Sequence, residues 1–201
     1  MIKLGSHNSW SFAKLKQWYV PAFVCRCQRL NIKEQYAKGV RLFDLRLRLY
    51  KNEWFTAHGS ARFNVDFYDD LRWLNEQGDV YVRVLLEYNK IPKNFDAIVE
   101  QFKIVCSFLE KSLPNIKFFG GEAKCTWNVV YKFRNDNIKI IDKYSSTTSL
   151  FKSGKLSIID DWWPWFYAKF HNKQNYKNFV ESEQDGYFLL RCHSTRFELC
   201  C

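Results

Sequence analysis

Alternation of apolar and polar positions dominates the first half of the chain. In residues 40–50, leucines occupy every second position from 45 to 49, and charged residues fill the positions between them. A period of two is typical of a β-strand whose two faces meet different surroundings. This segment gives the strongest strand prediction in the sequence.

Shorter patterns predict the remaining elements. Residues 80–86 are apolar at nearly every position, as expected of a strand buried on both faces. Further strands are predicted at 2–4, 54–57, 116–119, 138–141, 156–159 and 187–192. Apolar residues at helical spacing, with capping residues or glycines at the ends, predict helices at 31–36, 65–76, 95–113 and 172–183. This order of strands and helices indicates an α/β fold with a parallel sheet.

Polar residues directly follow several of the predicted strands, namely His7, His58, Glu87 and Asp160. In a barrel of parallel strands those ends converge on one face, where active sites form. A length of 201 residues suits one domain, spanning 1–201, and is short for eight full strand–helix units. We therefore expect a reduced or distorted TIM (β/α) barrel.

Composition narrows the class of partner. The chain is 47% apolar and 26% charged, which is ordinary for a globular protein, and its net charge is +10. A basic protein favours a polyanionic partner, either an anionic membrane surface or a nucleic acid. The basic residues are scattered and form no dense block, so nucleic-acid binding rests on charge and an aromatic content of 18% alone. We expect a peripheral membrane contact rather than nucleic acid.

Cysteines and the N-terminal sequence indicate the compartment. Seven cysteines form no regular framework, which favours a reducing environment. Cys25 and Cys27 lack a second pair at zinc-site spacing, and Cys200 and Cys201 do not form a four-residue prenylation box. No secretion signal is visible, and no apolar run is long enough to span a membrane. We expect a cytoplasmic or virus-encoded protein.

Motifs in the first sixty residues carry a family resemblance. The segments 5–9 (GSHNS) and 39–46 (GVRLFDLR), with Gln35 and the pair His58-Gly59, resemble the successive motifs of the X region of phosphatidylinositol-specific phospholipase C. Their order and spacing both fit. Beyond Glu87 only the strand pattern is similar.

The resemblance implies a two-histidine cleavage of a phosphodiester on a distorted TIM barrel. His7 would be the general base and His58 the general acid; a histidine with a pKa of ~6.5 can hold either proton state at neutral pH. Arg46 would hold phosphate oxygens with its planar fork, and Asp44 would orient Arg46 or His7.

Other residues are expected to contact the substrate. Asn8 and Glu87 belong to the motif region, and Trp10 is expected to line the mouth and stack on a sugar or inositol ring. Asp160 and His193 come from later strands. The aromatic cluster 162–166 could form a rim that dips into lipid, or fold over the barrel mouth.

Metal dependence remains an alternative. Asn8 and Glu87 look like the calcium-dependent enzymes of the family, whereas Arg46 looks like the bacterial, metal-free ones. A fixed cation at Arg46 would repel a nearby divalent ion, so we expect no metal. If a metal binds, Asn8, Asp44 and Glu87 offer the oxygen ligands that Ca²⁺ or Mg²⁺ prefers.

Three hypotheses about function follow. The leading one is a phospholipase C-type enzyme that cleaves a phospholipid, with an inositol lipid as one candidate, through a cyclic phosphate. The second is a metal-dependent phosphodiesterase acting on a glycerophosphodiester or sphingomyelin. The third is a binding or structural protein that retains the fold without turnover.

Overall fold

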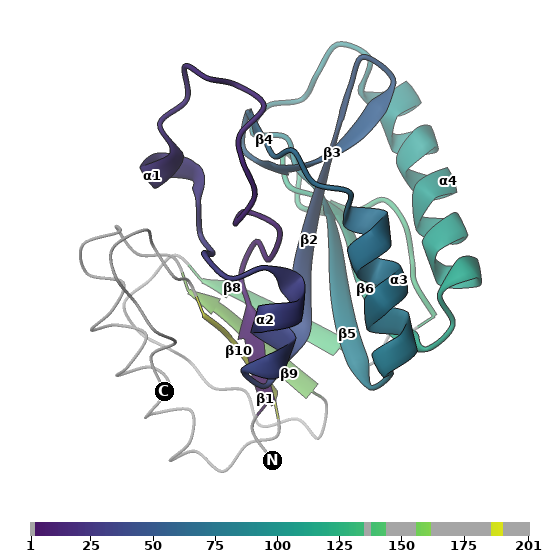
Figure 1. The fold of residues 1–201 in the computed structure, drawn as a ribbon. Coiled ribbons are helices and arrows are strands. Elements are labelled where there is room, and N and C mark those ends of the chain that lie inside the picture. The colour runs from purple at the N-terminus through teal and green to yellow at the C-terminus, as the bar shows by residue number, and fades with distance from the viewer. Residues whose placement is uncertain (1–2, 135–137, 144–155, 162–185, 191–201) are drawn as a thin grey trace.

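A parallel sheet organises the computed structural model, which describes residues 3–134, 138–143, 156–161 and 186–190. Seven strands of these ranges lie parallel in the order β6-β5-β2-β1-β10-β9-β8 (Figure 1). Their bounds are β1 (Lys3–Ser6), β2 (Val40–Tyr50), β5 (Val80–Leu86), β6 (Ile116–Ala123), β8 (Ile138–Lys143), β9 (Leu156–Asp161) and β10 (Gly186–Leu190). The predicted α/β class is confirmed.

Short antiparallel strands extend this sheet. β3 (Glu53–His58) pairs with β2 and with β4 (Ala61–Arg62), and β7 (Asn128–Val129) pairs with β6. Across the described ranges no pairing joins β8 to the strands at the opposite edge, so the sheet is open there. The structure therefore shows the parallel order of strands but not the closure of a TIM barrel.

The helices α2 (Ile32–Ala37), α3 (Phe67–Gln77) and α4 (Phe95–Ser112) lie against the sheet, and Figure 1 shows α3 and α4 side by side next to β5 and β6. The one-turn helix α1 (Ala22–Cys25) lies in the loop between β1 and α2, away from the sheet. Asn31 caps α2 in a reciprocal capping box with Glu34, and Asp66 caps α3. The helix predicted at 172–183 lies outside the described residues. Among the helices that are described, none is long and apolar enough to cross a membrane.

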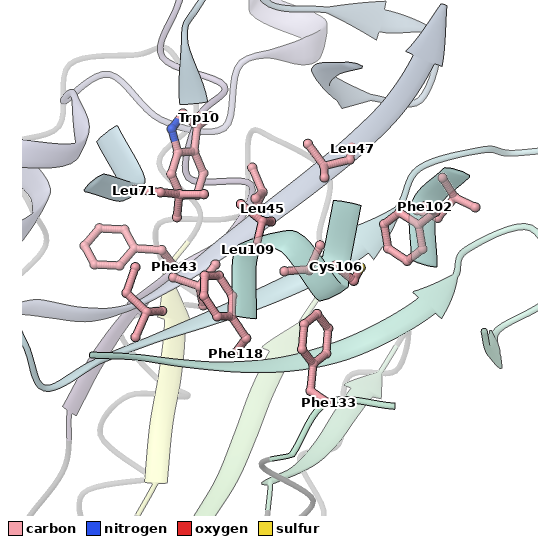
Figure 2. Close-up of a cluster of buried hydrophobic side chains, with 14 of the residues drawn as sticks. Trp10, Phe43, Leu45, Leu47, Leu71, Phe102, Cys106, Leu109, Phe118 and Phe133 are labelled. Atoms are coloured by element: carbon pink, nitrogen blue, oxygen red, sulfur yellow. The ribbon is translucent and has the colours of Figure 1, made fainter. Parts of the chain in front are cut away.

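The hydrophobic core lies between the sheet and these helices. Phe43, Leu45 and Leu47 of β2 are fully buried in it together with Phe102 of α4 (Figure 2). The opposite face of β2 carries Asp44 and Arg46, which are also buried. The predicted two-faced strand is confirmed, and its faces separate an apolar core from a buried cluster of charges.

Candidate active site

The turn after β1 places His7 against β2. Ser9 and Asp44 exchange hydrogen bonds: the Ser9 amide donates to the Asp44 carbonyl (2.9 Å), and the Asp44 amide donates to the Ser9 hydroxyl (2.8 Å). The Asn8 amide donates to Oδ2 of Asp44 (2.9 Å). Asn8 has a φ of 46°, a left-handed conformation that asparagine tolerates well. This fixed turn brings Nδ1 of His7 to 3.6 Å from the Asp44 carboxylate.

Arg46 links the residues of this cluster. Its Nε donates to Oδ2 of Asp44 (2.7 Å), and its Nη1 lies 3.5 Å from Oε2 of Glu87. Its Nη2 lies 3.2 Å from Nδ1 of His7. Asp44 and Arg46 are two residues apart on one strand, and Glu87 follows the neighbouring strand β5, so the parallel pairing of β2 with β5 brings all three together. The guanidinium is held by two carboxylates beside the imidazole.

Glu87 is a second anchor for the cluster. It is fully buried, and its Oε1 accepts hydrogen bonds from the Gly59 amide (2.7 Å) and from the Lys124 ammonium. Burial opposes ionisation of this carboxyl, but the positive charges of Arg46 and Lys124 dominate and lower the pKa of Glu87. Gly59 has a φ of 62°, which favours glycine at this point. Glu87 thereby fixes both Arg46 and the turn after His58.

His58 ends β3 and faces His7. The hairpin from β2 to β3 returns the chain to the same end of the sheet, where the two imidazole centroids lie 6.4 Å apart in an edge-to-face arrangement. Nδ1 of His58 lies 2.9 Å from the carbonyl oxygen of Cys25. Because a carbonyl only accepts, the proton of the neutral ring lies on Nδ1, and Nε2 is the basic nitrogen. His58 is partly exposed, whereas His7 is buried.

Cys27 completes the cluster and was not among the predicted site residues. Its thiol is buried and lies 3.7 Å from Nδ1 of His58. Burial opposes ionisation, yet the charge of His58 and hydrogen bonds with His58 and His7 lower the pKa of Cys27 well below its usual range. In turn, the charge of Cys27 raises the pKa of His58, although partial desolvation of the ring opposes the shift. Cys27 stands in no regular spacing with either histidine, so the sequence carries no signal for this contact.

Of the other predicted site residues, the structure places the side chain of Trp10 only. Trp10 is fully buried in the hydrophobic core, where Figure 2 shows it above Phe43, and its indole N–H donates to Oδ2 of Asp70 (2.9 Å). The expectation that Trp10 lines the mouth is therefore corrected. Asp160 lies in β9, opposite Asp142 of β8. His193 and the aromatic cluster at 162–166 are outside the described residues.

The oxygen ligands named for the alternative metal, Asp44 and Glu87, are in contact with cationic side chains. Asp44 already accepts from Arg46 and from the Asn8 amide, and Glu87 from Lys124 and Gly59, with Arg46 also at 3.5 Å. The Arg46 guanidinium lies against both carboxylates, and a fixed cation there repels a divalent ion placed close to it. Metal-free catalysis is therefore part of the function proposed below.

Solved structures of bacterial phospholipases share this fold. A variant of the phosphatidylinositol-specific phospholipase C from Staphylococcus aureus matches with a TM-score of 0.64 at 15% identity, over 98% of this chain and 88% of that one. The phosphatidylinositol-specific phospholipase C from Listeria monocytogenes matches with a TM-score of 0.60 at 15% identity, over 94% and 87% of the two chains. No protein-family model matches the sequence, and neither does any curated protein. The chain thus has the fold of the phosphatidylinositol-specific phospholipases C, and the resemblance seen in the motifs is confirmed at the level of the fold.

Proposed function

We propose that this protein is a phospholipase C-type phosphodiesterase that cleaves a phospholipid, with an inositol lipid as the first candidate. The observation that carries the proposal is the convergence of His7, His58 and Arg46 on one cluster. Two imidazoles within reach of one phosphodiester supply an acid and a base, and the guanidinium supplies positive charge for the phosphate oxygens. We take the domain to span 1–201 and its sheet to belong to a distorted barrel.

In the proposed reaction, a hydroxyl of the head group attacks the phosphorus next to it. His7 takes the proton of that hydroxyl, a new P–O bond closes a cyclic phosphate, and the bond to the lipid oxygen breaks. His58 protonates the departing lipid alkoxide. Each such proton transfer contributes roughly 10² to 10⁴ in rate. The raised pKa of His58 keeps its imidazole protonated further toward neutral pH, as an acid requires.

In this proposal Asp44 orients His7, and Arg46 orients the phosphate. In the structure Nδ1 of His7 accepts from Nη2 of Arg46 (3.2 Å), and Oδ2 of Asp44 lies 3.6 Å away, beyond hydrogen-bond range. We propose that, with substrate bound, Nδ1 takes the proton and closes on Asp44, so that Nε2 becomes the base. Nη2 of Arg46 then turns to a phosphate oxygen. The side-chain amide of Asn8 is buried and forms no hydrogen bond with any described residue. Because buried polar groups are normally hydrogen-bonded, we take this amide to bind the substrate. We propose that no metal takes part, since the carboxylates are already bound by cations.

A membrane contact beside the site is part of the proposal. Trp18 and Tyr19 are 94% and 67% exposed, and Lys14 and Lys16 precede them in the same loop. Gln17 ties this loop to the Ser60 carbonyl (2.7 Å), two residues after His58. Exposed aromatic and basic side chains suit an anionic lipid surface. One of the structures that share the fold concerns membrane binding by the Staphylococcus aureus enzyme.

The test uses purified protein, phosphatidylinositol vesicles and a strong chelator. Phosphorus NMR should detect a soluble cyclic phosphate from the wild type, and His7→Ala and His58→Ala should each abolish it. His171→Ala serves as the histidine control and should retain turnover. Absence of product, or equal rates in both variants and the wild type, would contradict the proposal; vesicle binding without product would favour a binding protein.

A further inference from the structure

Cys27 adds to the proposed active site a metal-binding thiol that phosphodiester cleavage does not use. The cleavage mechanism assigns roles to both imidazoles and none to the thiol. Yet Sγ of Cys27 and one nitrogen each of His7 and His58 lie within 4.8 Å of one another. Of the described residues, these three form the cluster of metal-binding side chains. Cys27 itself is held in place, because its amide donates to the Ser11 hydroxyl (2.9 Å).

We propose that His7, Cys27 and His58 form an inhibitory site for Zn²⁺. One thiolate and two imidazoles are the ligands that zinc accepts, whereas Ca²⁺ and Mg²⁺ require oxygen. Three protein ligands leave the fourth tetrahedral position to water. With bonds of about 2.0 to 2.3 Å, ligand atoms on zinc stand roughly 3.3 to 3.8 Å apart. The three ligand atoms now lie within 4.8 Å of one another, so side-chain movements of about 1 Å bring them to the spacing found on zinc.

The surroundings of the two histidines suit metal ligation. Nδ1 of His58 donates to the Cys25 carbonyl, and Nδ1 of His7 faces Asp44 and Arg46. A metal-binding histidine usually has its second nitrogen bound to a carbonyl or a carboxylate, and the Cys25 carbonyl is such a partner for His58. Sγ of Cys27 lies 3.7 Å from that same Nδ1, so ligation through Nε2 requires the thiol to turn toward the other nitrogen. For His7 it requires Nη2 of Arg46, now 3.2 Å from Nδ1, to turn away and leave that nitrogen to Asp44. The three ligands come from the turn after β1, the segment after α1 and the end of β3, so their spacing in the sequence resembles no zinc motif.

The charge at this place tolerates a dication. Arg46 is the nearest cation, but Asp44 at 2.7 Å and Glu87 at 3.5 Å lie against it and offset its charge. The Cys27 thiolate offsets one charge of the zinc ion directly. Bound zinc would occupy the lone pairs that His7 and His58 need for proton transfer, so the zinc-loaded protein would not cleave a phosphodiester. This last consequence rests on the proposed function, whereas zinc binding does not.

Zinc binding can be measured without substrate. The purified protein is stripped with a chelator, dialysed and titrated with Zn²⁺ against a chromophoric competitor; one ion per chain is expected. Cys27→Ser and His58→Ala should each weaken the affinity by more than the roughly 10- to 100-fold typical of losing an outer partner. Cys125→Ser, which alters a partly buried thiol that is not part of the cluster, should leave affinity unchanged.

Cobalt substitution in the wild type makes the test independent of any variant's folding. Co²⁺ bound to Cys27 should show thiolate-to-cobalt charge-transfer absorption, which disappears when zinc is added. Absence of that absorption, or equal zinc affinity in the wild type and in folded Cys27→Ser, would overturn the zinc site. Zinc binding in a stripped protein that cleaves no phospholipid would leave the zinc site standing and refute the proposed function. Turnover that Zn²⁺ does not inhibit would refute the inhibitory role.

Discussion

Nη2 of Arg46 lies 3.2 Å from Nδ1 of His7, and Nε of the same guanidinium donates to Asp44 at 2.7 Å. One planar cation therefore contacts both the proposed base and the carboxylate that orients it. Its fork geometry makes these contacts possible at once, which a lysine could not do. The role of Arg46 in the site depends on shape as well as on charge.

Replacing Arg46 by lysine should retain the fold and remove most turnover. The lysine side chain would keep a positive charge between Asp44 and Glu87 but lose the directed donors, so we expect kcat to fall by about 10² to 10³. Steady-state kinetics on phosphatidylinositol vesicles measures the effect, with thermal unfolding to check the fold. Arg41→Lys is the matched control, because Arg41 lies on the same strand and contacts Tyr36 instead of the site. Equal losses in the two variants would contradict a special role for Arg46.

Glu87→Gln should destabilise the protein in a pH-dependent way. The pKa of Glu87 is lowered in the fold, so its charge contributes stability that is present above the ordinary pKa of about 4.3 and is lost as the pH falls through the lowered value. At neutral pH we expect the variant to lose about 3 to 5 kcal/mol, as when a buried ion pair is broken. Urea unfolding over a pH series should show the difference shrinking in acid. A difference that does not change with pH would contradict this account.

Asp70→Asn should stabilise the protein at neutral pH, the opposite of the effect expected for Glu87→Gln. Burial raises the pKa of Asp70 to about 6, although the hydrogen bond from Trp10 opposes the shift. The folded state thus favours the protonated carboxyl, and stability is lost as the pH rises from about 4 to about 6. Asparagine retains an acceptor for Trp10 and does not ionise. We expect equal stability near pH 4 and a gain of about 1 kcal/mol near pH 7, discounted for partial exposure. Chemical unfolding of both proteins at the two pH values tests this.

The exposed aromatic pair should govern membrane binding. We expect the double variant Trp18→Ala/Tyr19→Ala to partition into anionic vesicles on the order of tenfold less well, because two apolar side chains are lost from the contact. Vesicle sedimentation measures the partition. Phe108→Ala is the control, since Phe108 is a similarly exposed aromatic residue on α4. If the control loses as much binding as the double variant, the loop does not form the contact.

Much of the fold could be predicted from the alternation of residue types. The bounds of β2 and β5 agree with the sequence prediction because one strand has two distinct faces and the other is buried on both. The convergence of His7, Arg46 and His58 was predicted from the family resemblance of their motifs. Strand ends in a parallel sheet do not explain it, because Arg46 lies inside β2 and His58 ends the antiparallel strand β3. The closed barrel expected from the sequence is not shown, because the sheet is open between its two edge strands in the described ranges.

Contacts between distant segments could not be predicted. Cys27 reaches the histidines through hydrogen bonds from residues 27 and 28 to Ser11, and no sequence spacing encodes that approach. Lys124 reaches Glu87 because β6 pairs with β5. Trp10 was misplaced because its position after a site motif does not reveal which way the turn directs it. Asp70 satisfies its indole N–H and allows complete burial.

The division of labour between His7 and His58 can be tested by changing the leaving group. Rates are compared for a phosphatidylinositol substrate and for an inositol phosphodiester with a p-nitrophenol leaving group, which departs without protonation. We predict that His58→Ala recovers most of its lost rate on the activated substrate, whereas His7→Ala remains inactive on both, because the attacking hydroxyl still needs a base. Equal losses on both substrates for His58→Ala, or rescue of His7→Ala alone, would contradict the account.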